Sequence, residues 1–152
     1  MISVQINEAA IQQLQQRLAG LAPRIVAKVY DALKPLVYQS LLNTIPKYFA
    51  GSGGPGSALL ASRTGNLMNS VLQSIQTTVD NDGLKVSIGS NLKYAAIHEY
   101  GGYAGRRGPF KKKDGKRPYL PARPYLHPAI YDLQQALPSL LEQAIQQVQV
   151  TQ

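Results

Sequence analysis

Histidine and glutamate are neighbours at His98 and Glu99, and an imidazole beside a carboxylate is the usual pair for acid–base chemistry or metal binding. The other histidine is His127, and neither histidine lies in a His-Glu-x-x-His arrangement. Adjacent side chains on a helix point about 100° apart, so His98 and Glu99 do not converge on one ion. We therefore favour a structural, hydrogen-bonding role for His98 and keep a catalytic or metal-binding role as the alternative.

A second candidate, Gly51–Gly56, has the glycine content of a phosphate-binding loop. It lacks the Gly-Lys-Ser/Thr ending, and it does not sit between a strand and a helix. No Gly-x-Ser-x-Gly elbow occurs in the chain. The absence of cysteine excludes thiol catalysis, disulfides and cysteine-ligated metals. The sequence thus predicts neither an enzyme nor a bound cofactor.

Positive charge is concentrated in one segment. The net charge is +8, and residues 93–123 hold nine basic and two acidic residues, a local excess of seven. Residues 103–118, the basic arm, have enough glycine and proline to predict an extended segment. Its candidate interaction residues, together with Arg123 beyond it, are Arg106, Arg107, Lys111, Lys112, Lys113, Lys116 and Arg117. Three interpretations stay open: nucleic-acid binding with stacking on nearby aromatic rings, docking on an acidic protein ring, and a solvated loop.

Hydrophobic periodicity predicts the elements that hold these residues. In the first half of the chain, apolar residues alternate at Ile2, Val4 and Ile6, which indicates a short strand. Apolar stripes predict a helix over 8–21, capped by Asn7, and a second helix from Ile25 to Pro46, kinked at Pro35. The Gly- and Ser-rich residues 46–62 are expected to form a flexible surface loop.

The second half of the chain predicts a short helical turn over 66–71 and a hairpin of two strands, 72–79 and 84–90. Helical turns follow over 94–99, and a long amphipathic helix runs from Leu126 to Val148 with a bend at Pro138. We expect one α+β domain over residues 1–152, with long N- and C-terminal helices packed on a small antiparallel sheet.

No stretch approaches the roughly 20 apolar residues of a membrane span, and the N-terminus lacks the pattern of a signal peptide. We therefore expect a soluble protein that is made in a cytoplasm and has no membrane partner.

Three short motifs occur in a fixed order along the chain. They are Ser62–Leu67 followed by Ser70 and Val71, Leu92–Gly102, and Pro121–Leu126. The set resembles the phage virion morphogenesis and tail-completion proteins of tailed bacteriophages, whose pattern is similar to R/K-T-G-x-L-x-x-S, Y-A-x-x-H-x-x-G and P-A-R-P-F/Y-L. The basic, Gly-rich arm lies between the last two motifs. Departures from the pattern are the long lysine run in the arm and Tyr125, where Phe is common.

The resemblance implies a minor structural protein without enzyme activity, located at the head-tail interface of the virion and in the host cytoplasm during assembly. Its implied partners are other virion proteins, namely the tail terminator, the tail tube, and the connector or adaptor. The resemblance also implies a homo-oligomeric ring, for which six copies is the number considered, and genomic DNA is a further candidate contact. The alternative is a small nucleic-acid-binding protein that uses residues 103–123.

Physical roles can be assigned to the motif residues. Thr64 would cap the short helix and Gly65 would allow a close backbone approach. Tyr94 and His98, four residues apart, would share a helix face and pin the hairpin to it. The prolines around Arg123 would stiffen the chain and present its guanidinium group. The structural motif residues are Arg63, Thr64, Gly65, Tyr94, His98, Gly101, Pro121 and Pro124.

Overall fold

A strand and a capped helix open the chain. The computed structural model describes residues 2–51, 59–60, 65–81, 83–103 and 118–150. Strand β1 (Ile2–Gln5) leads into helix α1 (Glu8–Leu18), and the Asn7 side chain accepts a hydrogen bond from the Ala10 backbone N–H at 2.9 Å. The predicted strand, helix and N-cap are therefore confirmed, and the helix ends three residues before the predicted Leu21.

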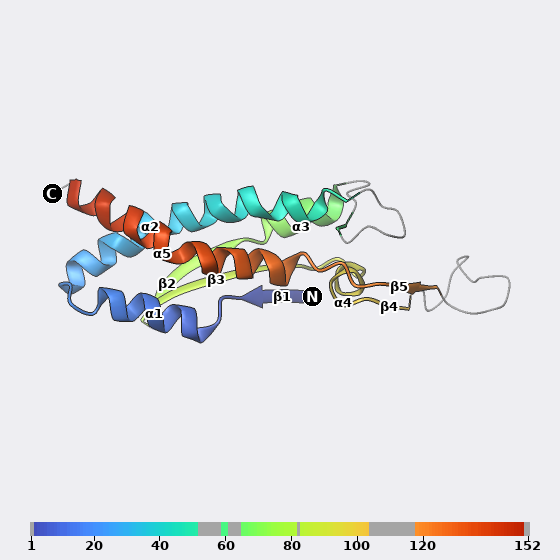
Figure 1. Ribbon diagram of the computed structural model, residues 1–152, viewed down its shortest axis with the longest axis horizontal. Helices are drawn as coiled ribbons and strands as arrows, with labels where there is room; N and C mark the ends of the chain where they lie inside the picture. The colour runs from blue at the N-terminus through green and yellow to red at the C-terminus, as the bar shows by residue number, and fades with distance from the viewer. Residues whose placement is uncertain (1, 52–58, 61–64, 82, 104–117, 151–152) are drawn as a thin grey trace.

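Helix α2 (Pro23–Thr44) begins with Pro23 in its first turn, where a proline costs no hydrogen bond, and contains Pro35. Its axis changes direction partway along, as Figure 1 shows between the light-blue and cyan parts, in agreement with the predicted kink.

The loop expected over 46–62 starts differently from the prediction. A 3-10 helix, η1 (Ile45–Phe49), continues from α2 and buries Phe49. Leu60 is buried as well, and its backbone N–H donates to the Tyr48 carbonyl at 3.2 Å. Proline at the second position of η1 ends the α-helical ladder but fits a short 3-10 turn. The rest of this expected loop, 52–58 and 61–62, lies outside the described residues.

The small sheet has three antiparallel strands in the order β1-β3-β2. Helix α3 (Asn66–Gln73) precedes β2 (Gln76–Asp80), which pairs with β3 (Gly83–Ser90) as the predicted hairpin. The first predicted strand residues, 72 and 73, belong instead to α3, which extends two residues beyond the predicted 66–71. The apolar pairs Val4↔Ile88 and Val79↔Leu84 lie on one face of the sheet.

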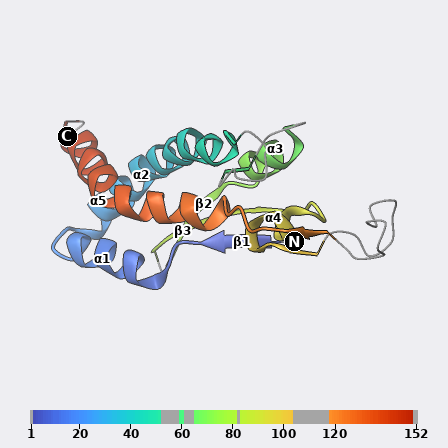
Figure 2. The ribbon, with the colours of Figure 1, turned by 45° about the vertical axis from the view of Figure 1, so that its right-hand side comes forward.

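Two long helices cover that apolar face. Helix α5 (Leu126–Val150) lies beside α2, with α5 over β1 and α2 over β2, so that the helices and the sheet share one hydrophobic core (Figures 1 and 2). Pro138 lies within α5, whose axis bends in both views, as predicted. This arrangement confirms the predicted α+β class.

A narrow extension projects from one end of the core (Figure 1). It holds helix α4 (Ala95–Tyr100), close to the helical turns predicted over 94–99. It also holds a two-stranded antiparallel ribbon, β4 (Gly102–Tyr103) and β5 (Tyr119–Leu120), and the sequence did not predict this ribbon. We call residues 94–103 and 118–125 the tip. Residues 104–117 of the basic arm lie outside the described residues. No helix in the part of the chain that the structure describes is both long and apolar enough to cross a membrane.

Candidate functional site

Glu99 is the most heavily hydrogen-bonded side chain of the tip. Its side chain is 1% exposed. One carboxylate oxygen, Oε2, accepts from the backbone N–H groups of Tyr125 at 2.7 Å and Leu126 at 2.9 Å, and the other, Oε1, accepts from the His127 backbone N–H at 3.0 Å. These donors lie at the start of α5, where backbone N–H groups have no partner within the helix. Glu99 therefore caps α5 from 27 residues earlier in the chain.

His127 completes the environment of this carboxylate. Its ring nitrogen Nδ1 lies 2.6 Å from Glu99 Oε1, and its ring contacts Tyr100 edge to face with centroids 5.7 Å apart. Both oxygens of Glu99 are thus bound by the beginning of α5. Among the described residues, no group of three or more His, Asp or Glu side chains is arranged to hold a metal ion.

His98 points to a different neighbour from Glu99. Its ring contacts Tyr94 edge to face at a centroid distance of 5.9 Å, and its backbone carbonyl accepts from the Arg123 N–H at 2.8 Å. Burial, together with the positive charge of Arg123, lowers the pKa of the His98 imidazole below its ordinary value. The expected sharing of a helix face by Tyr94 and His98 is present. The contacts join these two rings to each other, and Tyr94 remains 42% exposed rather than buried against the hairpin.

The segment Pro121–Leu126 packs along α4. Tyr125 is buried, its hydroxyl donates to the Ala95 carbonyl at 3.0 Å, and its ring lies 5.2 Å from that of Phe49. Burial, with the nearby negative charge of Glu99, raises the pKa of this tyrosine. Pro121 and Pro124 are exposed on either side of Arg123. The structure therefore brings together the second and third sequence motifs.

Gly101 makes this packing possible. Its φ is +73°, and a Cβ atom here would lie 2.8 Å from the Ala122 nitrogen and 3.0 Å from the Leu120 oxygen. A side chain would thus be both conformationally strained and in collision with the returning chain.

The first motif lies elsewhere, at the start of α3. The N-cap residue is Gly65 and not Thr64, which lies with Arg63 outside the described residues. Gly65 has a φ of +73°, and among the described residues a Cβ there would meet only the Asn69 side chain, at 3.6 Å. The left-handed conformation favours glycine at this position, and the expected close backbone approach stays a prediction because residues 61–64 lie outside the described part of the chain.

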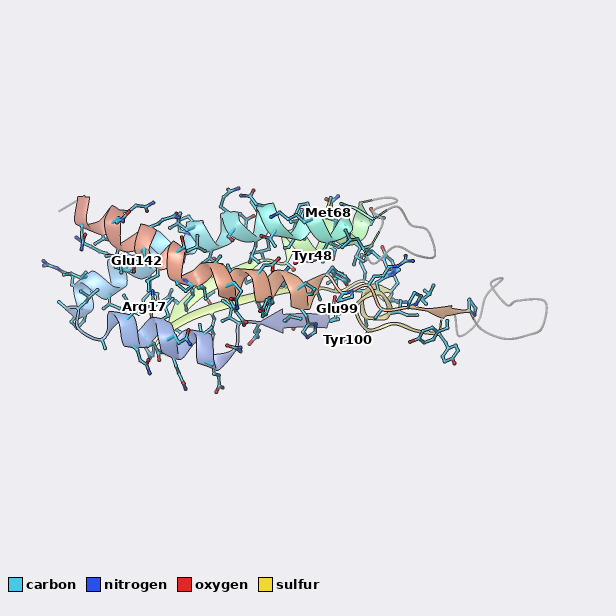
Figure 3. The ribbon with its side chains drawn as sticks, viewed as in Figure 1. Arg17, Tyr48, Met68, Glu99, Tyr100 and Glu142 are labelled. Carbon is cyan, nitrogen blue, oxygen red and sulfur yellow. The ribbon has the colours of Figure 1, made fainter. Side chains whose placement is uncertain are left out.

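The surface of the tip is aromatic. Tyr100, Tyr103 and Tyr119 are 60%, 67% and 59% exposed. Tyr103 and Tyr119 pair across the ribbon, with ring centroids 5.3 Å apart and an interplanar angle of 71°. Figure 3 shows Glu99 and Tyr100 at this end of the molecule. The candidate arm residues lie outside the described residues, and the chain connects them to the tip through β4 and β5. They are Arg106, Arg107, Lys111, Lys112, Lys113, Lys116 and Arg117.

Sequence reasoning did not find the capping role of Glu99. A signal was present, because the residues before Leu126 are Arg123, Pro124 and Tyr125, none of which has a side chain that caps a helix. A long helix without a local cap requires an acceptor from elsewhere in the chain.

The sequence matches the profile described as the phage virion morphogenesis family over residues 10–146. It is 30% identical over 134 residues to Mu-like prophage FluMu G protein 2 of Haemophilus influenzae, covering 83% of each chain. It is 33% identical over 70 residues to an uncharacterized protein of Methanocaldococcus jannaschii, covering 46% of this chain and 42% of the other. No solved structure matches.

Proposed function

Because this chain belongs to the phage virion morphogenesis family and its role is therefore in virion assembly, we propose that it is a minor structural protein of the head-tail junction. Copies of the chain assemble as a ring that joins the tail to the connector. The ring contacts other virion proteins, such as the tail terminator and the tail tube. The protein has no enzymatic activity in this role.

The observation that carries the proposal is the use made of Glu99. The His98–Glu99 pair suggested chemistry, but its carboxylate holds α5 in place, since both oxygens of Glu99 accept hydrogen bonds from the start of that helix. What the tip offers to solvent is a set of exposed tyrosines beside a strongly basic segment. Such a surface suits binding to another macromolecule.

Complementation of particles tests this function. Phage particles assembled without this protein should contain separate heads and tails, and the purified protein should join them, as counted by electron microscopy. Mass spectrometry of the joined particles should give six copies per particle. An unchanged proportion of joined particles after addition of the protein would contradict the proposal.

The basic arm separates this function from nucleic-acid binding. Replacing Lys111, Lys112 and Lys113 with Ala should reduce incorporation into particles, while the wild-type protein binds DNA weakly. If DNA is the partner, the affinity should fall with salt by a log-log slope of about −0.9 for each neutralised phosphate. The triple substitution should then make that slope shallower by up to about three units. Tight DNA binding at physiological salt with unaffected assembly would favour the nucleic-acid alternative.

A further inference from the structure

We propose that Tyr100, Tyr103 and Tyr119 form a docking surface, the tyrosine face, which binds an acidic surface on a different virion protein. The inference rests on the proposed function and deepens it by naming the residues that dock and the kind of partner they fit. The tyrosine face consists of described residues only: it takes Tyr103 from the described end of the basic arm and includes none of residues 104–117.

Exposure is the first observation that supports the tyrosine face. Among the large apolar and aromatic side chains that the structure describes, four are at least 59% exposed, and three of these are on the tip. Tyrosine is enriched at the centres of protein interfaces because one side chain supplies a large apolar area together with a hydroxyl donor. Their gathering on one small projection is therefore typical of an interface.

The tyrosine face is also held in place before any partner arrives. Tyr103 and Tyr119 are fixed opposite each other by strand pairing, and Tyr100 ends α4, whose neighbouring Glu99 is bonded to α5. Gly101 lets the chain returning from the ribbon lie directly against α4. Side chains on a preorganised backbone lose less conformational freedom on binding, so more of their contact energy appears as affinity.

Charge indicates an acidic partner. Glu99 is the only acidic residue in the described part of the tip, and its side chain is 1% exposed. Arg123 lies within the tip and Lys93 immediately before it, and residues 104–117 carry seven Lys or Arg against one Asp. Tyrosine hydroxyls donate hydrogen bonds readily to carboxylates. Carboxylates on the partner would therefore meet donors and positive charge together.

Another copy of this chain does not fit as the partner. The described part contains six acidic residues spread over α1, α2, β2, α4 and α5, and five of them already have partners within the chain. In the described part of the chain the carboxylates are thus dispersed over five elements and mostly paired. The acidic surface must therefore belong to a different protein.

Ring geometry disfavours single-stranded nucleic acid. Base stacking needs open ring faces along a groove. Tyr103 and Tyr119 instead lie edge to face at 71°, and Tyr100 lies at 64° to His127, so neighbouring rings do not present parallel faces on which successive bases could stack. This geometry favours a protein surface, which makes mixed contacts with ring edges, ring faces and hydroxyl groups.

The test uses heads and tails isolated from particles made without this protein. Wild-type protein should co-sediment with one of the two, and Y103A/Y119A should bind that particle about 30-fold more weakly, corresponding to about 1 kcal/mol for each tyrosine. The control is Tyr38→Ala, which removes a 41% exposed tyrosine from α2 and should bind like wild type. Circular dichroism and the melting temperature should match wild type for both variants.

The outcomes separate the two proposals. Wild-type binding to neither particle would overturn the proposed function and this inference with it. Equal binding by wild type and Y103A/Y119A would overturn this inference alone, as would an equal loss in Tyr38→Ala. Tighter binding to a DNA oligonucleotide than to either particle, lost in Y103A/Y119A, would assign the tyrosine face to nucleic acid and overturn the inference. If Y103A/Y119A does not fold, Tyr100→Ala carries the same test without disturbing the ribbon pair.

Discussion

At the scale of single residues, Glu99 stabilises a helix that starts far from it in sequence. An ordinary N-cap, such as Asn7 on α1, accepts one backbone N–H. Glu99 accepts three and adds a contact with a histidine ring. Its negative charge also lies at the positive end of the α5 dipole. We therefore expect Glu99 to contribute more to stability than a local cap does.

Replacing Glu99 with Gln should lower the free energy of unfolding by about 3 kcal/mol, because charged acceptors form the stronger hydrogen bonds and the amide NH2 would face backbone donors. The matched control is Asn7→Ala, which should cost about 1 kcal/mol. Urea denaturation measures both changes. A Glu99→Gln effect no larger than that of Asn7→Ala would contradict the expectation that the remote cap contributes more to stability than a local cap.

His98 should make stability depend on pH. Its folded-state pKa lies below the ordinary 6.5 because of burial and the charge of Arg123. Below pH 6.5 the unfolded chain therefore takes up the proton before the folded chain does, and stability falls until the folded pKa is passed. In His98→Gln this component is absent, so the advantage of wild type over the variant in melting temperature should be larger at pH 7.5 than at pH 5.5. A gap that is constant or widens in acid would contradict this assignment.

The sequence predicted a structural role for the His98–Glu99 pair, but not that Glu99 binds the start of α5 while His98 contacts Tyr94 and Arg123. Adjacent helical positions point in different directions, which argued against a shared ion. Which of the two side chains meets α5 depends on how the chain returns from the ribbon, and that is a tertiary contact. Periodicity and spacing contain no information about it.

At the scale of elements, the pairing of β1 with β3 depends on one glycine. A Cβ atom on Gly89 would lie 2.3 Å from the Ile2 carbonyl oxygen and 3.0 Å from Ser3 Cα. These are backbone atoms of the neighbouring strand, which cannot rotate away as a side chain can. Strand β1 can therefore lie at its observed place only if residue 89 has no side chain.

We expect Gly89→Ala to displace β1 and to lower the free energy of unfolding by about 2 kcal/mol or more. Gly20→Ala is the control, since no atom of the described residues lies within 4 Å of a Cβ at Gly20, and its effect should stay within about 0.5 kcal/mol. Denaturation gives the energies, and amide exchange of residues 2–5 reports the strand directly. Unchanged protection of these amides in Gly89→Ala would contradict the steric argument.

Elements with a repeated pattern could be predicted, and those without one could not. Helices α2 and α5 carry apolar stripes over many turns, and the hairpin has a recognisable Asp- and Gly-containing turn. The ribbon has two residues in each strand, too few to show alternation, and its strands are separated by 15 residues of chain. Most of the 3-10 helix η1 falls in the predicted loop over 46–62, because glycine and serine dominate the residues that follow it.

At the scale of the whole molecule, one core joins the helices and the sheet. Buried residues of α1, α2, α3, α4, α5, η1, β1 and β3 form a single hydrophobic cluster, and partly buried residues of β2 pack against it. Elements that share a core lose their packing together. We expect equilibrium unfolding to be cooperative, with far-UV and near-UV circular dichroism giving one midpoint.

Leu33→Ala tests this shared core from its centre. Leu33 is fully buried on α2, and its truncation should cost about 3 kcal/mol while leaving a single transition. Leu21→Ala, at a position that is 37% exposed, should change stability by about 0.5 kcal/mol or less. Two separate transitions, one reporting the helices and one the sheet, would show that the core is divided.

The cap on α5 also decides how the molecule bears tension. Residues 104–117 connect to the tip through β4 and β5, so a pull on them enters the protein along two routes, one through α4 and one through α5. The bonds to Glu99 cross-link these routes just before the core, which places several hydrogen bonds under load together instead of one after another. From that junction α5 extends for about 37 Å, and its buried side chains spread the force over the whole packed interior. Glu99 thus joins the two routes, and a pull on residues 104–117 is transferred there to the packed core.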